Sequence, residues 1–156
     1  MSHEKVNECV ILKDLHYSVE DNTWVKVNDD GTVTIGMTDV AQSLAGPILH
    51  AKTKSVGTGR KKGRPIATVE SGKWVGPVKS PVSGEIIEIN AGLAGDAQLI
   101  NRSPYGTGWV VKMKPENLEA EIGEMTTGDE AVAKYKEKIE RDNIQACTHI
   151  AGSDTY

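Results

Sequence analysis

Short stretches in which apolar and polar residues alternate fill much of the first two thirds of the chain, a pattern typical of half-buried β-strands. Residues 24–27 and 32–35 are two such stretches. The residues between them include Asp30-Gly31, a dipeptide that favours tight hairpin turns. A further apolar stretch at residues 109–113 precedes Pro115 and predicts a closing strand. The pattern therefore favours a mainly β fold built from hairpins.

Helical patterns are confined to three segments. Residues 38–45 predict one or two helical turns, which a threonine or an aspartate caps and a Gly-Pro pair ends. Residues 93–101 have modest helical character. In residues 129–143, apolar residues three and four apart form a narrow stripe, which predicts an amphipathic helix. The residues after about 148 are expected to fray.

A turn that presents Lys73 is the segment of greatest functional interest. Two apolar-rich stretches, residues 64–69 and 80–90, flank it and predict two strands joined by a bend. Gly72 is expected to adopt a positive φ in this turn, and Glu70 offers a modifying enzyme an acidic recognition point. An ε-amine at such a bend can carry a covalent group into another protein's active site. The alternative is an ordinary solvated lysine, which is the common state of this residue type.

A weak internal repeat surrounds this lysine. Residues 46–57 and 84–95 both begin and end with glycine and have isoleucine in third place. Each copy has the pattern of a strand that leads into a glycine-marked turn. Two similar halves predict a pseudo-symmetric sandwich, with the lysine turn as one of its hairpins.

Composition limits the class of protein. The chain has 156 residues, 38% of them apolar, which suffices for one well-cored domain. The net charge of -4 gives no reason to expect nucleic acid or a membrane surface as partner. The sequence lacks a signal-peptide pattern, so we expect a cytoplasmic protein. Cys9 and Cys147 have no ligand-like spacing and are expected to be free thiols in a reducing compartment.

The histidines do not suggest a metal site or an acid–base centre. His16, His50 and His149 fall in unrelated segments with no carboxylate at ligand spacing, so we expect surface or core-edge positions. No arrangement of side chains typical of an enzyme occurs in the chain.

Four motifs extend the pattern around Lys73 to a large part of the chain. The first is Glu-Ser-Gly-Lys73, followed by Ser-Pro-Val-Ser-Gly-Glu-Ile-Ile-Glu-Ile-Asn90. The others are Tyr17-Ser18 with Trp24-Val25, the segment at residues 34–42, and Asn-Arg-Ser-Pro-Tyr-Gly-Thr-Gly-Trp109. Together they cover about residues 15–114 and resemble, in order and spacing, the glycine cleavage system H proteins.

This resemblance implies a lipoyl carrier rather than an enzyme. The expected fold is a flattened barrel or sandwich of β-hairpins with short helices and a C-terminal amphipathic helix. Lys73 matches the position that carries lipoic acid in amide linkage, and Glu70, Ser71, Gly72 and Trp74 would shape its turn. A lipoate-protein ligase or lipoyl transferase would be a partner. Biotin is the nearest rival, but biotinyl lysines lie between methionines, unlike Lys73.

The resemblance also divides the chain. It implies an N-terminal extension at 1–14, an H-protein-like lipoyl domain at 15–115, and an acidic C-terminal segment at 116–156 with a helix that packs on the domain.

Three departures from the family pattern concern the pathway. Trp74-Val-Gly-Pro77 follows the lysine where small and acidic residues are usual, and Asn22-Thr23-Trp24 replaces His-Glu-Trp. Residues 52–64 have no acidic residue where an acidic segment is usual. This stretch, the basic segment, contains Lys52, Lys54, Arg60, Lys61, Lys62 and Arg64. If it lies near the lysine arm, it would favour an acidic partner, and reversing Lys61 and Lys62 to Glu would slow transfer.

These departures resemble the lipoate-binding proteins of heterodisulfide-reductase-like sulfur oxidation. That reading implies a heterodisulfide-reductase-like complex and dihydrolipoamide dehydrogenase as partners. The first alternative is the glycine cleavage H protein itself, which carries the aminomethyl group between the P, T and L proteins. The second is an H-like scaffold or lipoyl-relay protein that is not lipoylated.

Overall fold

Three antiparallel sheets form the framework of the fold in the computed structural model, which describes residues 2–155. The largest has the strand order β12 (Thr126–Thr127), β3 (His16–Ser18), β4 (Thr23–Val27), β5 (Val33–Met37), β11 (Val111–Pro115), β10 (Gly84–Ile89) and β7 (Gly59–Arg60). The second has the order β6 (Ile48–Thr53), β8 (Pro65–Ser71) and β9 (Val75–Lys79). The third is a hairpin of β1 (His3–Val6) and β2 (Cys9–Leu12).

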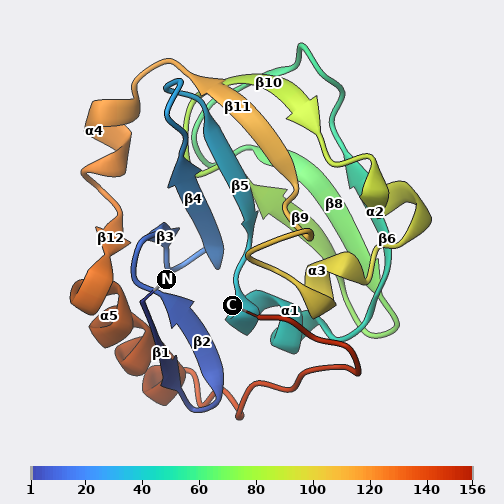
Figure 1. Cartoon of the computed structure of the whole chain (residues 1–156), viewed down its shortest axis with the longest axis vertical. Helices are drawn as coiled ribbons and strands as arrows, with labels where there is room; N and C mark the ends of the chain where they lie inside the picture. The colour runs from blue at the N-terminus through green and yellow to red at the C-terminus, as the bar shows by residue number, and fades with distance from the viewer. Residues whose placement is uncertain (1, 156) are drawn as a thin grey trace.

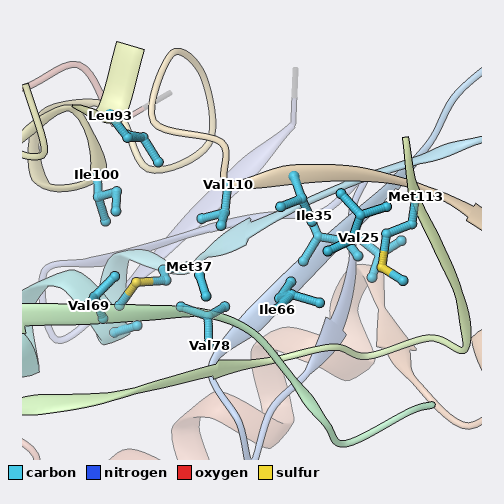
Figure 2. Close-up of a cluster of buried hydrophobic side chains, with 14 of the residues drawn as sticks. Val25, Ile35, Met37, Ile66, Val69, Val78, Leu93, Ile100, Val110 and Met113 are labelled. Carbon is cyan, nitrogen blue, oxygen red and sulfur yellow. The ribbon is translucent and has the colours of Figure 1, made fainter. Parts of the chain in front are cut away.

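The two larger sheets enclose the main hydrophobic core. Figure 2 shows Val25, Ile35 and Met113 of the seven-stranded sheet beside Ile66 and Val78 of the three-stranded sheet. Along β8 the inward residues are buried while the alternate residues are exposed, as the pleat of a half-buried strand requires. This arrangement confirms the predicted mainly β sandwich of hairpins.

Five helices lie at the periphery of the sheets within residues 2–155. They are α1 (Asp39–Ala45), α2 (Gly92–Gly95), α3 (Leu99–Arg102), α4 (Leu118–Ile122) and α5 (Gly128–Arg141). In Figure 1, α4, β12 and α5 run down one flank of the molecule. The predicted helices at 38–45 and 129–143 are confirmed, whereas residues 93–101 form parts of two short helices. Over these residues, every helix is too short or too polar to cross a bilayer.

The apolar stripe of α5 completes a second core. Val132, Tyr135 and Ile139 are buried against Tyr17 and Trp24. The Tyr17 and Tyr135 rings meet edge to face, with centroids 5.7 Å apart. The C-terminal helix therefore packs on the β domain.

One lysine of α5 is buried, although its sequence position gives no sign of this. The Lys138 ammonium donates to the carbonyls of Val19 and Glu20 and to Asn22 Oδ1, at 2.6, 3.2 and 3.1 Å. Its burial lowers the pKa of the ammonium, and the nearby Glu20 carboxylate opposes that shift. Lys138 thus holds the turn that leads into β4.

We expect Lys138→Met to lower the free energy of unfolding by about 2 kcal/mol, because the side chain keeps its apolar contacts but three acceptors each lose a charged donor. Lys134→Met is the matched control, since Lys134 is exposed on the same helix, and it should change stability by less than about 0.5 kcal/mol. Urea denaturation of both variants measures the difference. An equal decrease in the free energy of unfolding for both variants would contradict a stabilising role of Lys138 at the turn before β4.

The N-terminal hairpin is joined to the C-terminal end of the chain. Cys9 and Cys147 form a disulfide between Cα atoms 4.9 Å apart, so the expectation of two free thiols is wrong. The sequence could not show this pairing, because 138 positions separate the two cysteines. Residues 148–155, expected to fray, instead form hydrogen bonds to α1 and α3, among them Thr148 N to Ser43 Oγ.

The internal repeat corresponds to two strands on opposite sheets. The copy at 46–57 contains β6, and the copy at 84–95 contains β10. The end of the first copy meets the second, since Gly57 N donates to the Ile86 carbonyl at 2.8 Å. Each copy of the repeat therefore contributes one strand to one of the two larger sheets.

Candidate functional site

Lys73 lies at the closed end of the hairpin formed by β8 and β9. Ser71 N donates to the Trp74 carbonyl at 2.8 Å, and Lys73 N donates to Ser71 Oγ at 3.3 Å. These bonds close a four-residue turn from which Lys73 is exposed. The second strand of the hairpin is β9 and not the predicted residues 80–90, whose apolar part is β10 on the other sheet.

The expectation for Gly72 is wrong. Gly72 is not among the residues with positive φ, and a Cβ at this position would meet nothing within 4 Å. The turn therefore does not require glycine here. Glu70 faces outward, opposite His50 on β6 and Val75 on β9, so its carboxylate is available to a second protein.

The lysine side chain runs past the end of α1. A Cβ on Gly46, the residue that ends this helix, would lie 3.1 Å from Lys73 Cε. Gly46 has a φ of 79°, a conformation that glycine adopts without strain. The Gly-Pro pair that terminates α1 thus also makes room for the stem of Lys73.

A groove of about 280 Å³ lies beside this turn, between α1 and β9. Its lining includes seven apolar residues, namely Met37, Ala41, Leu44, Ala45, Trp74, Pro77 and Val78. Asp21, Asn22 and Thr23 complete it. An exposed amine next to a mostly apolar groove fits a lipoyl group, which is an aliphatic chain joined to the lysine by an amide.

Trp74 forms one wall of the groove. Its ring lies over Gly76, where a Cβ would come within 2.2 Å of a ring atom. The residue is 39% exposed, so one part of the ring packs on the body and another faces solvent. This packing explains how a large aromatic side chain is tolerated beside an exposed lysine.

Residues of three sequence motifs meet beneath α1. Asn101 Oδ1 accepts from Ile48 N at 2.8 Å, and Asn101 Nδ2 donates to the Gly46 carbonyl at 2.9 Å. Trp24 Nε1 donates to the carbonyls of Met37 and Pro104, both at 3.0 Å. The motif residues therefore fix the loop that supports Lys73 rather than contact a cofactor themselves, a role that their sequence spacing alone did not reveal.

The groove opens beside exposed apolar side chains. Leu44 is 47% exposed at the end of α1, Leu49 is 55% exposed on β6, and Val75 is 62% exposed on β9. Ile48 pairs with Ser71 at the same end of the sheet, which places Leu49 close to the turn. These residues give the surface around Lys73 an apolar character that a partner protein can bury.

Most of the basic segment lies away from Lys73, contrary to the expectation that it approaches the arm, and Lys52, which pairs with Thr68 on β8, is its nearest member along the sheet. Pro65 pairs with Lys79 at the open end of the hairpin, whereas Glu70 pairs with Val75 next to the turn. Arg64 is therefore about 20 Å from the turn, given the rise of a β-strand. The sequence placed the two features a few residues apart, but an extended strand separates them in space.

Half of the basic segment is occupied by contacts within the protein. Arg60 Nε donates to the Pro65 carbonyl at 2.8 Å, Lys61 pairs with Glu116 at 3.8 Å, and Lys62 pairs with Glu124. The other three basic residues are exposed and form no ion pair within residues 2–155, and they are Lys52, Lys54 and Arg64.

A histidine and an aspartate that are far apart in sequence form a buried contact. His149 Nε2 lies 2.9 Å from both carboxylate oxygens of Asp39, which also accept from Val10 N and Gln42 Nε2. The three histidines lie at the surface or at the edge of the core, as expected, but their sequence spacing did not reveal that His149 meets a carboxylate. No cluster of potential metal ligands occurs among residues 2–155.

Comparison with known proteins places this site in a family. The sequence model described as glycine cleavage H-protein matches residues 15–138. The glycine cleavage system H protein 2 of Aquifex aeolicus is 51% identical over 144 residues, which cover 90% of this chain and 89% of the relative. The probable glycine cleavage system H protein 2 of Saccharolobus solfataricus is 43% identical, with 88% and 94% covered.

A solved structure agrees with these sequence matches. The crystal structure of a glycine cleavage system H protein from Mycobacterium marinum superposes with a TM-score of 0.70 at 30% identity, and covers 80% of this chain and 98% of that one. The sandwich of β-hairpins agrees with this solved fold. The chain therefore belongs to the glycine cleavage H-protein family.

Proposed function

We propose that this chain is a lipoyl carrier and that lipoic acid is attached to Lys73. Proteins of this family are carriers rather than enzymes and hold lipoic acid covalently on a lysine. The assignment rests on the position of Lys73, which is exposed at the closed end of the β8–β9 hairpin. Two hydrogen bonds close this turn, from Ser71 N to the Trp74 carbonyl and from Lys73 N to Ser71 Oγ. The exposed Glu70 carboxylate would help a ligase to recognise this turn.

The chain's own residues hold and present the cofactor. When bound, the lipoyl group supplies a dithiolane that exchanges between disulfide and dithiol forms and can accept a transferred group at sulfur. The hairpin fixes the attachment point, and Gly46 leaves space for the lysine stem. The groove between α1 and Trp74 offers an apolar surface beside the attachment point. The protein supplies position and contact, and its partners supply catalysis.

Intact-mass spectrometry of the unmodified chain, after incubation with lipoate, ATP and a lipoate-protein ligase, tests the carrier assignment. We expect one lipoyl group per chain, and we expect peptide mapping to locate it on Lys73. An unchanged mass would favour the scaffold or lipoyl-relay alternative. Modification of any other lysine would contradict the assigned site.

For the pathway, we propose that the chain carries the aminomethyl group of glycine among the glycine cleavage P, T and L proteins. The names of the relatives support this proposal, since proteins up to 51% identical over nearly the full chain are called glycine cleavage system H proteins. A cytoplasmic location, which the sequence predicts, suits these partners.

Service in heterodisulfide-reductase-like sulfur oxidation, together with dihydrolipoamide dehydrogenase, is the second candidate. Two observations favour it. Trp74 places an aromatic wall beside the lysine, where the family pattern has small residues. In addition, Aquifex aeolicus has H proteins numbered 2, 3 and 5 that all resemble this chain, and one glycine cleavage pathway does not need so many carriers.

Reconstitution separates the two pathways. The lipoylated chain is offered first to P protein with glycine and bicarbonate, and glycine-dependent carboxyl exchange is measured. It is then offered to a heterodisulfide-reductase-like complex with a sulfur donor, and release of oxidised sulfur is measured. Exchange with the first system alone supports glycine cleavage, and turnover with the second alone supports sulfur oxidation.

Charge reversal tests whether the basic segment docks a partner. Lys52, Lys54 and Arg64 are suitable positions because, unlike Lys61 and Lys62, they form no internal ion pair in residues 2–155. We expect Lys52→Glu/Lys54→Glu/Arg64→Glu to slow transfer about tenfold at low salt and to flatten its salt dependence. Lys26→Glu, an exposed site outside the segment, is the control. An unchanged rate would remove the docking role.

A further inference from the structure

The last residues of the chain form a strap across α1. Residues 143–155 follow α5 without regular structure and run beneath the N-terminal hairpin to α1 and α3 (Figure 1). Thr148 N donates to Ser43 Oγ, and the Thr148 carbonyl accepts from Gln42 Nε2, both at 2.9 Å. Asp154 N donates to the Arg102 carbonyl. We call residues 143–155 the C-terminal strap.

One covalent bond and several polar contacts hold the strap. The Cys9–Cys147 disulfide is buried at its centre, where Cys147 N also donates to the Asn7 carbonyl at 3.0 Å. His149 meets the buried Asp39 carboxylate two residues further on. Each hydrogen bond contributes only about 1 kcal/mol net, and the strap contains no strand or helix that would cooperate with these contacts. The disulfide is therefore the attachment whose loss would matter most.

A hydrogen-bonded chain connects the strap to the loop beneath Lys73. Gln42 Nε2 donates to the Thr148 carbonyl, while Gln42 Oε1 accepts from Asn101 Nδ2 at 3.2 Å. Asn101 Nδ2 also lies 2.9 Å from the Gly46 carbonyl, and Gly46 is the residue against which Lys73 Cε lies. Two side chains thus span the distance from the strap to the lysine platform, which we define as residues 44–48.

We propose that Cys9–Cys147 is a redox site, and that its reduction by a dithiol frees the C-terminal strap and loosens the lysine platform. A thiolate of the dithiol attacks one cysteine sulfur, breaks the S–S bond and releases the other cysteine as a thiolate. The second thiolate of the reductant then attacks the reductant's own sulfur in the mixed disulfide and releases the remaining cysteine as a thiolate. The dithiol ends as a disulfide, and both cysteines end as thiols after protonation, which is a balanced two-electron exchange.

The consequence for the carrier is a change in how firmly Lys73 is presented. With the disulfide closed, α1 is held by the strap on one face and by Asn101 at its end. With the disulfide open, Gln42 loses one of its three partners, and the end of α1 is free to fluctuate. The effect on lipoyl transfer rests on the proposed function. The greater mobility at the end of α1 does not depend on lipoate and is measured on the unmodified chain.

Hydrogen exchange of the unmodified chain, with and without dithiothreitol, tests this inference, and thiol alkylation followed by mass analysis confirms the redox state. On reduction, we expect amides of residues 144–155 to exchange about tenfold faster or more, and those of residues 44–48 to exchange several-fold faster. The amides of β4, β5 and β11 should keep their protection. Cys9→Ser/Cys147→Ser should resemble the reduced chain in both conditions.

Gln42→Ala removes the side chain that links the C-terminal strap to the lysine platform, and leaves the disulfide in place. In the oxidised variant, we expect residues 44–48 to exchange faster while residues 149–155 keep most of their protection. Three outcomes would overturn the inference: a disulfide that resists dithiothreitol in native buffer, reduction that leaves residues 44–48 unchanged, or reduction that accelerates exchange equally throughout the sheets. None of these readouts depends on lipoate, so a failed carrier assignment would be recognised separately by mass.

Discussion

Replacement of Lys73 by arginine should abolish lipoyl incorporation completely. Arginine retains the length and charge of the side chain, but its guanidinium does not form the amide that attaches lipoic acid. The turn should survive, because its bonds join Ser71 to Trp74 and to the backbone of residue 73. Incubation with ligase, ATP and lipoate, followed by intact-mass measurement, should therefore show no added group on Lys73→Arg.

Lys79→Arg is the matched control for this experiment. Lys79 is exposed on the same hairpin but lies at its open end, opposite Pro65. A ligase that recognises the closed turn should modify Lys79→Arg at the rate of the original chain. Circular dichroism of both variants should show the same thermal unfolding. Residual incorporation in Lys73→Arg, or loss of incorporation in Lys79→Arg, would contradict attachment at Lys73.

The parts of the fold that rest on local signals could be predicted from the sequence. The Asp-Gly turn does join β4 to β5, and Gly31 there has a φ of 85°. Thr38 caps α1 by accepting from Ala41 N at 3.1 Å, and Gly46 ends the helix. Each of these features depends on residues fewer than ten positions apart, so the chain pattern contains the needed information.

Features that depend on long-range register could not be predicted. Arg64 and Lys73 are near in sequence, yet β8 carries them to opposite ends of one hairpin. Cys9 meets Cys147, and Asp39 meets His149, only because the strap returns across α1. The sequence places Trp74 beside Lys73, but only the structure shows Gly76 beneath its ring. In the candidate site, the sequence predicted Lys73 as the attachment point, and the structure added the surfaces around this lysine.

Two tryptophans should respond very differently to the same substitution. Trp24 is 2% exposed, and its indole bridges two segments by donating to the carbonyls of Met37 and Pro104. Its ring also fills the space above Gly36, where a Cβ would come within 2.6 Å of it. Trp24→Ala would leave a large cavity and two carbonyls without their donor. We expect it to lower the free energy of unfolding by about 3–5 kcal/mol.

Trp74→Ala removes the same atoms from the edge of the groove. It should lower the free energy of unfolding by less than about 1 kcal/mol, because the Trp74 ring is partly exposed and packs over Gly76. Urea denaturation followed by far-UV circular dichroism is the suitable measurement, because fluorescence would change with the loss of either tryptophan. If the free energy of unfolding falls with urea concentration at the same slope in both variants as in the original chain, only stability has changed. If the two losses were equal, Trp24 would not be the anchor between the β4–β5 hairpin and the loop at Pro104. That anchor supports the loop on which Asn101 lies, so its loss should also weaken the platform beneath Lys73.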